Sequence, residues 1–156
     1  MVVVGASVAG LFAAQQLAQY GLPVRVYERS EQLASVARTL IVTPEMQRVL
    51  GRSADSATLN RVHTLELCAA GRAVPIVLKD PDLIVERSEL LRVLAERARQ
   101  AGAELVYGQD FQGFQAARDQ TLVTFRQRAT GDTHRVAARA VVAADGVRSH
   151  VARSLG

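Results

Sequence analysis

The spacing of apolar residues at the start of the chain changes twice over a short distance. Residues 2–4 form an uninterrupted run of valines, which is typical of a parallel strand buried on both faces. Residues 8–20 follow a helical spacing with many alanines, and Gly21 provides the stop for that helix. Val24, Val26 and Tyr27 then mark a second short strand. The pattern predicts a strand–helix–strand unit with parallel strands, because a helical crossover returns the chain to the same end of the sheet.

A period-two alternation predicts a β-hairpin over residues 61–79, with its turn at residues 70–72. In the first strand the face that carries Leu65 and Leu67 is the more apolar one, so we expect other parts of the protein to cover it. We expect residues 80–82 to end the second strand, because the proline among them lacks the N–H that a strand ladder needs.

The remaining pattern predicts two more helices, a loop, a meander and two further strands. The first helix is at 45–50, with Thr43 as N-cap and Pro44 at its first position, and a loop follows at 52–60. The second helix is at 89–101, with Ser88 as N-cap, and a strand follows at 104–107. An antiparallel meander of 111–116, 121–128 and 134–138 comes next, and a buried strand at 140–143 precedes a short helix. The predicted fold class is α/β, with a Rossmann-like βαβ unit and parallel sheet plus an antiparallel β-meander.

The turn between the first strand and the first helix carries the clearest chemical signal. Its sequence, Gly5-Ala6-Ser7-Val8-Ala9-Gly10, follows the G-x-G-x-x-G pattern with Ser7 in place of the middle glycine. Gly5 permits a sharp turn, Gly10 permits a close approach of the helix to the sheet, and the helix N-terminus attracts a pyrophosphate. The Cβ of Ser7 narrows that approach, and we expect its hydroxyl to compensate by donating to a phosphate oxygen.

Glu28 ends the second strand about 20 residues after the turn, where a carboxylate can accept hydrogen bonds from ribose hydroxyls. The turn and this acid together predict a dinucleotide site. Its candidate residues are Gly5, Ser7, Val8, Ala9, Gly10, Glu28 and the adjoining Arg29. The alternative interpretation is a structural βαβ unit that binds no ligand.

Composition narrows the function classes. The chain has 156 residues, enough for one domain with a core, and its net charge of +4 comes almost entirely from arginine, because Lys79 is the only lysine. No basic cluster is interleaved with aromatic residues, so we expect no nucleic-acid partner. The single cysteine, Cys68, excludes an internal disulfide and is expected to be a small core residue. The three histidines show no ligand spacing, so we expect no metal site.

No apolar run reaches the length that a membrane span needs, and the apolar start belongs to the first strand and helix rather than to a signal peptide. This fits the reduced, cytoplasmic setting that the single cysteine favours. We expect the partner to be a small-molecule substrate.

Two later motifs add to the glycine turn. Arg87-Ser88-Glu89-Leu90-Leu91 opens a predicted helix, and Ala144-Asp145-Gly146-Val147-Arg148-Ser149 follows a buried strand. With the glycine turn and Glu28, in this order and spacing, the chain resembles the superfamily of FAD-dependent monooxygenases and geranylgeranyl reductases, which has a p-hydroxybenzoate-hydroxylase-like fold. One departure is Ala143, where the family usually has glycine two places before the aspartate.

The resemblance implies a role for each motif. The glycine turn would hold the FAD pyrophosphate and Glu28 the adenosine ribose. Arg87 would contact FAD, Arg38 would match the family's arginine after the second strand, and Asp145 with Gly146 would lie over the pyrophosphate and assist with FAD and NAD(P)H. The flavin carries the redox chemistry in such proteins.

The resemblance also implies that residues 1–156 are part of an FAD-binding domain at the start of a larger flavin-dependent oxidoreductase. That enzyme would be a monooxygenase or reductase acting on an organic, hydrophobic substrate with NAD(P)H as electron donor. The hairpin at 61–79 would begin its substrate sheet. The family's later Gly-Asp motif is absent, so we expect the chain alone to be inactive, and it offers no catalytic constellation.

Two alternatives stay open. One is a stand-alone nucleotide-binding module without catalysis. The other is a short NAD(P) dehydrogenase, which is disfavoured because Lys79 has no tyrosine four residues before it.

Overall fold

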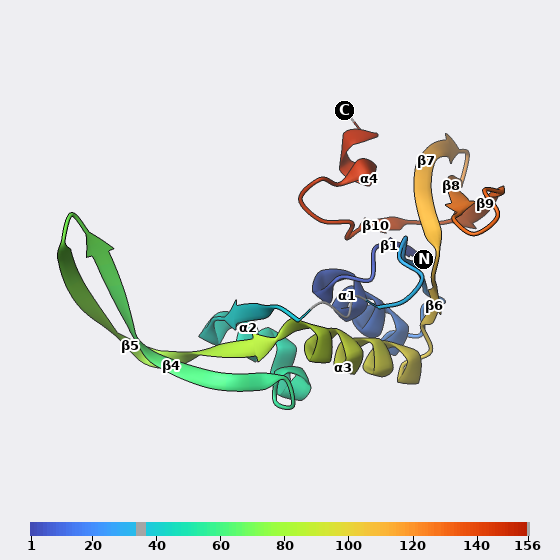
Figure 1. The fold of residues 1–156 in the computed structure, drawn as a ribbon. Coiled ribbons are helices and arrows are strands. Elements are labelled where there is room, and N and C mark those ends of the chain that lie inside the picture. Colours follow the sequence, from blue (N-terminus) through green and yellow to red (C-terminus); the bar gives the residue numbers. More distant parts are fainter. Residues whose placement is uncertain (34–36, 156) are drawn as a thin grey trace. The chain divides into compact units, whose positions relative to one another are not determined.

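The computed structural model describes residues 1–33 and 37–155. These residues belong to two compact units, Met1–Ala34 with Leu91–Gly156 and Ser35–Leu90 (Figure 1). No described helix is both long and apolar enough to cross a membrane.

A four-stranded parallel sheet forms the centre of the first unit. Its strands lie in the order β10, β1, β2 and β6, and every neighbouring pair is parallel. Their bounds are Val2–Val4 for β1, Arg25–Tyr27 for β2, Glu104–Val106 for β6 and Val141–Ala143 for β10. The valines of β1 are all buried, so the prediction of an interior parallel strand is confirmed.

Helix α1, Val8–Gln19, connects β1 to β2. It buries Leu11, Ala14 and Ala18, and Gly21 follows it with a φ of +76°. The helix thus ends where the sequence predicts. Helix α3, Arg87–Gln100, precedes β6, and it runs from the second unit into the first.

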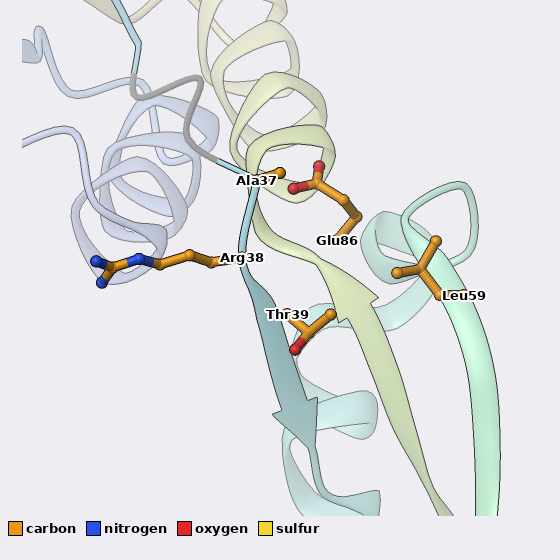
Figure 2. Close-up of a pocket in the computed structure, with 5 residues that line it drawn as sticks. All are labelled: Ala37, Arg38, Thr39, Leu59 and Glu86. Atoms are coloured by element: carbon orange, nitrogen blue, oxygen red, sulfur yellow. The ribbon is translucent and has the colours of Figure 1, made fainter.

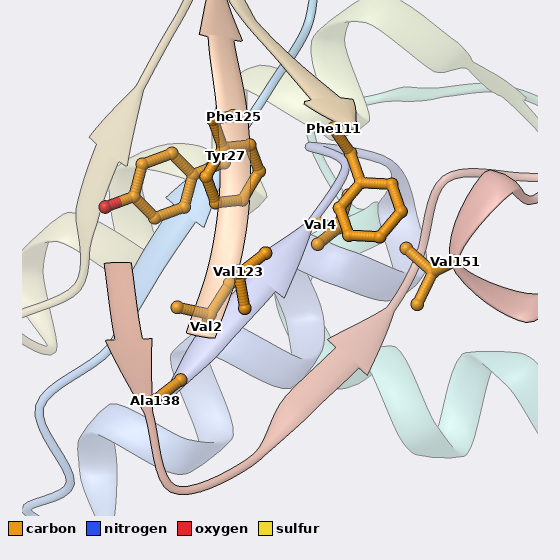
Figure 3. Close-up of a cluster of buried hydrophobic side chains, with 8 residues drawn as sticks. All are labelled: Val2, Val4, Tyr27, Phe111, Val123, Phe125, Ala138 and Val151. Atoms are coloured by element: carbon orange, nitrogen blue, oxygen red, sulfur yellow. The ribbon is translucent and has the colours of Figure 1, made fainter. Parts of the chain in front are cut away.

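An antiparallel meander covers one face of the parallel sheet. Its strands are β7 at Gln109–Ala117, β8 at Gln120–Gln127 and β9 at Thr133–Ala138, in that order in the sheet. Figure 3 shows the core between the two sheets, where Tyr27 of β2 stacks on Phe125 of β8 with ring centroids 4.1 Å apart. Val151 of the short helix α4, His150–Arg153, joins the same cluster. The predicted meander is therefore confirmed.

The second unit contains a three-stranded antiparallel sheet in the order β3, β5, β4. Its elements are β3 at Thr39–Val42, α2 at Pro44–Leu50, the 3₁₀ helix η1 at Gly51–Ala54, β4 at Thr58–Ala69 and β5 at Arg72–Glu86. Thr43 caps α2 as predicted. The expectation of a loop at 52–60 is wrong, because η1 occupies its start and β4 its end.

Strand β5 does not end at residues 80–82, which corrects the prediction. Val62 pairs with Asp82 and Thr64 with Val77, so residues 78–81 all lie opposite His63. Such a bulge leaves residues outside the regular ladder, and a proline is tolerated there because it has no N–H to lose. The strand resumes after the bulge.

The apolar face of the hairpin is exposed, which also differs from the expectation. Leu65 pairs with Ile76 and Leu67 with Val74, and these four side chains are 40–63% exposed. Cys68 is exposed as well rather than part of a core. The reason is that this part of β4 and β5 forms a two-stranded ribbon, and among the described residues β3 pairs with β5 only at the other end, from Leu83 to Glu86 (Figure 1).

The turn of the hairpin places an alanine in the left-handed conformation. Ala70 and Gly71 have φ values of +48° and +74°, as a two-residue type I′ turn requires. A left-handed alanine costs about 1–2 kcal/mol, and asparagine tolerates this conformation better. We expect Ala70→Asn to stabilise the hairpin by about 1 kcal/mol, measured as slower amide hydrogen exchange in β4 and β5. Gly71→Ala should have the opposite sign, and faster exchange in Ala70→Asn would contradict the assignment.

Candidate functional site

The turn after β1 has no room for side chains at its two glycines. A Cβ on Gly5 would lie 2.5 Å from the carbonyl oxygen of Ala144, and a Cβ on Gly10 would lie 2.1 Å from the carbonyl oxygen of Gly5. Gly5 also has a φ of +100°, which L side chains rarely adopt. The turn therefore packs directly against the chain that leaves β10, and this geometry fits the sharp turn expected at Gly5 and the close packing expected at Gly10.

Three backbone N–H groups at the start of α1 are left without acceptors. The N–H of Ala6 donates to Glu28 Oε2 at 2.8 Å, and the N–H of Gly10 donates to Ser7 Oγ at 3.2 Å. The N–H groups of Ser7, Val8 and Ala9 find no acceptor among the described residues. These donors and the positive end of a 12-residue helix form an anion site.

The other described α-helices begin with a carboxylate. Glu45 lies in the first turn of α2, where its own backbone N–H holds the pKa of its carboxyl below the usual value. Glu86 and Asp145 accept backbone N–H groups at the starts of α3 and α4. Helix α1 has no acid in its first turn, and its cap is the neutral Ser7. Within the described chain, α1 is thus the helix whose N-terminus lacks a carboxylate of its own.

The Ser7 hydroxyl does not take the role expected from the sequence. It donates to the carbonyl oxygen of Ala144 at 2.9 Å while it accepts from Gly10. A serine hydroxyl has one proton, so in this arrangement none is left for a phosphate oxygen. The nearest donors for an anion are the backbone N–H groups instead.

Glu28 follows β2 and faces the turn. Its Oε2 accepts from Ala6 and its Oε1 accepts from the N–H of Ser30 at 2.9 Å. Each carboxylate oxygen can accept a second hydrogen bond, so Glu28 keeps capacity for ribose hydroxyls. The adjoining Arg29 is exposed.

Asp145 lies beside the glycine turn, because a Cβ on Gly5 would come within 3.0 Å of its Cα. Its Oδ1 accepts from the Ser149 hydroxyl at 2.5 Å, and its Oδ2 accepts from the N–H groups of His150 and Val151. Partial burial by itself raises the pKa of Asp145, but these hydrogen bonds outweigh it and hold the pKa below the usual value. The carboxylate therefore fixes the start of α4.

In the second unit, two candidate arginines lie next to each other. The N–H of Arg87 donates to the carbonyl oxygen of Arg38 at 2.8 Å, because Glu86 of β5 pairs with Thr39 of β3. A pocket of about 580 Å³ lies at this junction. Figure 2 shows that the Arg38 guanidinium is directed away from the Glu86 carboxylate. The cavity is lined by Ala37, Arg38, Thr39, Leu59 and Glu86.

Glu86 rather than Ser88 caps α3, which corrects the prediction. The helix begins at Arg87, and Glu86 Oε2 accepts from the N–H of Glu89 at 2.7 Å and from the Ser88 hydroxyl at 2.5 Å. These hydrogen bonds lower the pKa of Glu86 to about 2, and the Ser88 hydroxyl contributes more than the Glu89 N–H.

The structure thus brings together the glycine turn, Glu28, Asp145 and Gly146 in one unit, and Arg38 with Arg87 in the other. Sequence reasoning missed two participants, the Ala144 carbonyl and the Glu86 cap. A backbone carbonyl leaves no side-chain signal in the sequence. Glu86 could have been found, because an acid three residues before Glu89 is suited to the positive N-terminus of a helix. Among the described residues no group of three metal-binding side chains is close enough to hold a metal ion.

Residues 1–156 match a family model described as an FAD binding domain. A search of curated proteins found no match.

Solved structures with the same fold include three informative ones. CabE, an aromatic hydroxylase from angucycline biosynthesis, is 28% identical with a TM-score of 0.80, and the match covers 99% of this chain and 32% of CabE. The flavin-dependent monooxygenase PieE, solved with FAD and substrate, is 20% identical with a TM-score of 0.85, covering 99% and 31%. A geranylgeranyl bacteriochlorophyll reductase-like protein from Thermoplasma acidophilum is 23% identical with a TM-score of 0.85, covering 99% and 41%. The chain therefore spans less than half the length of each.

The Glu86 cap predicts a pH dependence. A carboxyl whose pKa falls from 4.5 to about 2 on folding stabilises the native state above pH 4.5, and this contribution is lost as the pH falls towards 2. The urea concentration at the unfolding midpoint should therefore fall between pH 4.5 and pH 2, and we expect it to fall less in Glu86→Gln than in the wild type. Glu66→Gln, on the exposed hairpin, is the control and should leave the pH profile as it is. Identical profiles for wild type and Glu86→Gln would contradict the capping role.

Proposed function

The chain belongs to the FAD binding domain family, and from this premise we propose that it is the FAD-binding part of a larger flavin-dependent oxidoreductase. The enzyme would be a monooxygenase or reductase that uses NAD(P)H and acts on an organic, hydrophobic substrate. The names of the similar structures, an aromatic hydroxylase, a monooxygenase and a reductase-like protein, support these reaction classes. FAD, when bound, supplies the redox chemistry, while the residues of this chain bind and orient it.

The observation that carries the proposal is the unneutralised N-terminus of α1. Its free N–H groups at Ser7, Val8 and Ala9 suit a diphosphate, which brings both negative charge and several acceptor oxygens. The absence of side chains at Gly5 and Gly10 lets this turn pack closely against Ala144 and Asp145, which follow β10. The residues present therefore fit the pyrophosphate of a dinucleotide.

The other candidate residues take roles that their positions support. Glu28 would accept ribose hydroxyls with its unused lone pairs, and Arg29 beside it would stay near the adenosine half. Asp145 and Gly146 would contact the pyrophosphate side of FAD, since they lie against the glycine turn. Arg38 and Arg87, whose backbones are joined by one hydrogen bond, would each contact FAD, as the family resemblance implies.

The hairpin at 61–79 is proposed to begin the substrate sheet of that larger enzyme. Its exposed pairs Leu65 with Ile76 and Leu67 with Val74 form an apolar face of the kind that further strands or a substrate region would cover. The single cysteine, Cys68, is an exposed thiol on this hairpin, and this supports a reducing, cytoplasmic location.

Cofactor identity is tested on the full-length gene product that contains this chain. We expect the purified protein to show the visible absorbance of an oxidised flavin. Glu28→Gln should weaken FAD binding by about tenfold or more, because hydrogen bonds to a charged group contribute about 1.5–3 kcal/mol each. Fluorescence titration of the apoprotein measures this.

The matched control is Glu104→Gln, at the start of β6, where Glu104 only pairs with the exposed Arg25. It should leave FAD affinity unchanged. A protein that binds nucleotide without any flavin absorbance would favour the alternative, a nucleotide-binding module without catalysis.

The role of the hairpin is tested separately in the full-length protein. Leu67→Glu places a charge on the apolar face, and Thr64→Glu places one on the opposite face of the same strand. If the face is covered, Leu67→Glu should lower the free energy of unfolding by about 2 kcal/mol and Thr64→Glu by less than about 0.5 kcal/mol. Equal effects in urea titrations would contradict the proposal.

A further inference from the structure

The Ser7 hydroxyl connects two segments that are 137 positions apart in the sequence. It accepts from the N–H of Gly10 in the glycine turn and donates to the carbonyl oxygen of Ala144 in the turn after β10. Ala144 directly precedes Asp145, whose carboxylate holds the first turn of α4. One hydroxyl thus links both turns of the candidate site.

A glycine at this position would change the site in two ways. It would leave the Gly10 N–H without its side-chain acceptor, which gives an anion one more donor, and it would leave the Ala144 carbonyl without this donor. Serine gives up that extra amide donor and fixes the two turns against each other. Both hydrogen bonds have ordinary lengths, 3.2 Å from the Gly10 nitrogen to Ser7 Oγ and 2.9 Å from Ser7 Oγ to the Ala144 carbonyl oxygen.

We propose that Ser7 is a positioning residue that holds the Asp145-Gly146 turn against the glycine turn, so that both present a preformed surface to one FAD molecule. This inference rests on the proposed function for its ligand. Preorganisation of this kind improves affinity because less ordering remains to be done on binding. It also explains why a side chain is tolerated where the motif has glycine.

Ordinary helix capping is the competing explanation, and the chain offers a matched comparison. Thr43 caps α2 by accepting from the N–H of Met46 at 3.5 Å, and among the described residues its hydroxyl has no bond to a distant segment. Thr43→Ala therefore removes a helix cap without breaking a hydrogen bond between two turns. Ser7→Ala removes both the helix cap and the hydrogen bond to Ala144. Ser7→Thr keeps a hydroxyl at this position, whose extended N-cap backbone also suits threonine.

The experiment measures FAD dissociation constants and amide hydrogen exchange for the full-length protein and these three variants. We expect Ser7→Ala to bind FAD about tenfold more weakly, Ser7→Thr to stay within about threefold of wild type, and Thr43→Ala to match wild type. In the apoprotein, Ser7→Ala should speed exchange at Gly10 and also at His150 and Val151, whose N–H groups bond to Asp145.

Each other result is decisive. Unchanged affinity in Ser7→Ala, or equal losses in Ser7→Ala and Ser7→Thr, would overturn the positioning role. Faster exchange at Gly10 alone would reduce Ser7 to an ordinary cap and overturn it too. A wild-type protein that does not bind FAD, with exchange nevertheless coupled between the two turns, would refute the proposed function and remove the ligand from this inference.

Discussion

The close approach of three backbone segments at the carboxyl end of β1 governs this structure. Gly5, Gly10 and Ala144 meet there with no space for an additional Cβ on either glycine. The first N–H groups of an α-helix have no intrahelical acceptor, and those of Ser7, Val8 and Ala9 find none elsewhere among the described residues. A helix start of this kind attracts a phosphate without any charged side chain.

Among the described α-helices, α2, α3 and α4 each have a carboxylate at their N-terminus, whereas α1 has none in its first turn. Glu86 and Asp145 accept backbone N–H groups at the starts of α3 and α4, and the Ser88 and Ser149 hydroxyls together with these N–H groups hold the pKa values of the two carboxyls below their usual values. Glu28 bonds to Ala6, one residue before the cap of α1, and so supports the turn without neutralising the first turn of the helix.

The sequence predicts the parts of the fold that depend on local pattern, such as the valine strand, α1 with its Gly21 stop, and the meander. It misplaces features that depend on long-range partners. Leu67 and Cys68 are exposed because no described element packs on the faces of this part of the hairpin, which alternation alone does not reveal. The cap of α3 moves to Glu86 because a carboxylate binds an N–H more strongly than a hydroxyl does. The Ser7 bond needed the position of Ala144, which only the folded sheet provides.

The interior position of β1 has a consequence for how the protein is made. One edge of β1 pairs with β2, which follows after a single helix, whereas the other edge pairs with β10 near the opposite end of the chain. During synthesis β1 and β2 leave the ribosome before β10, so one apolar edge of β1 stays unpaired until β10 has emerged. Such late, non-local pairing slows folding and exposes nascent chains to aggregation. The interval before β10 appears is therefore the time during which this strand edge is open to pairing with other chains.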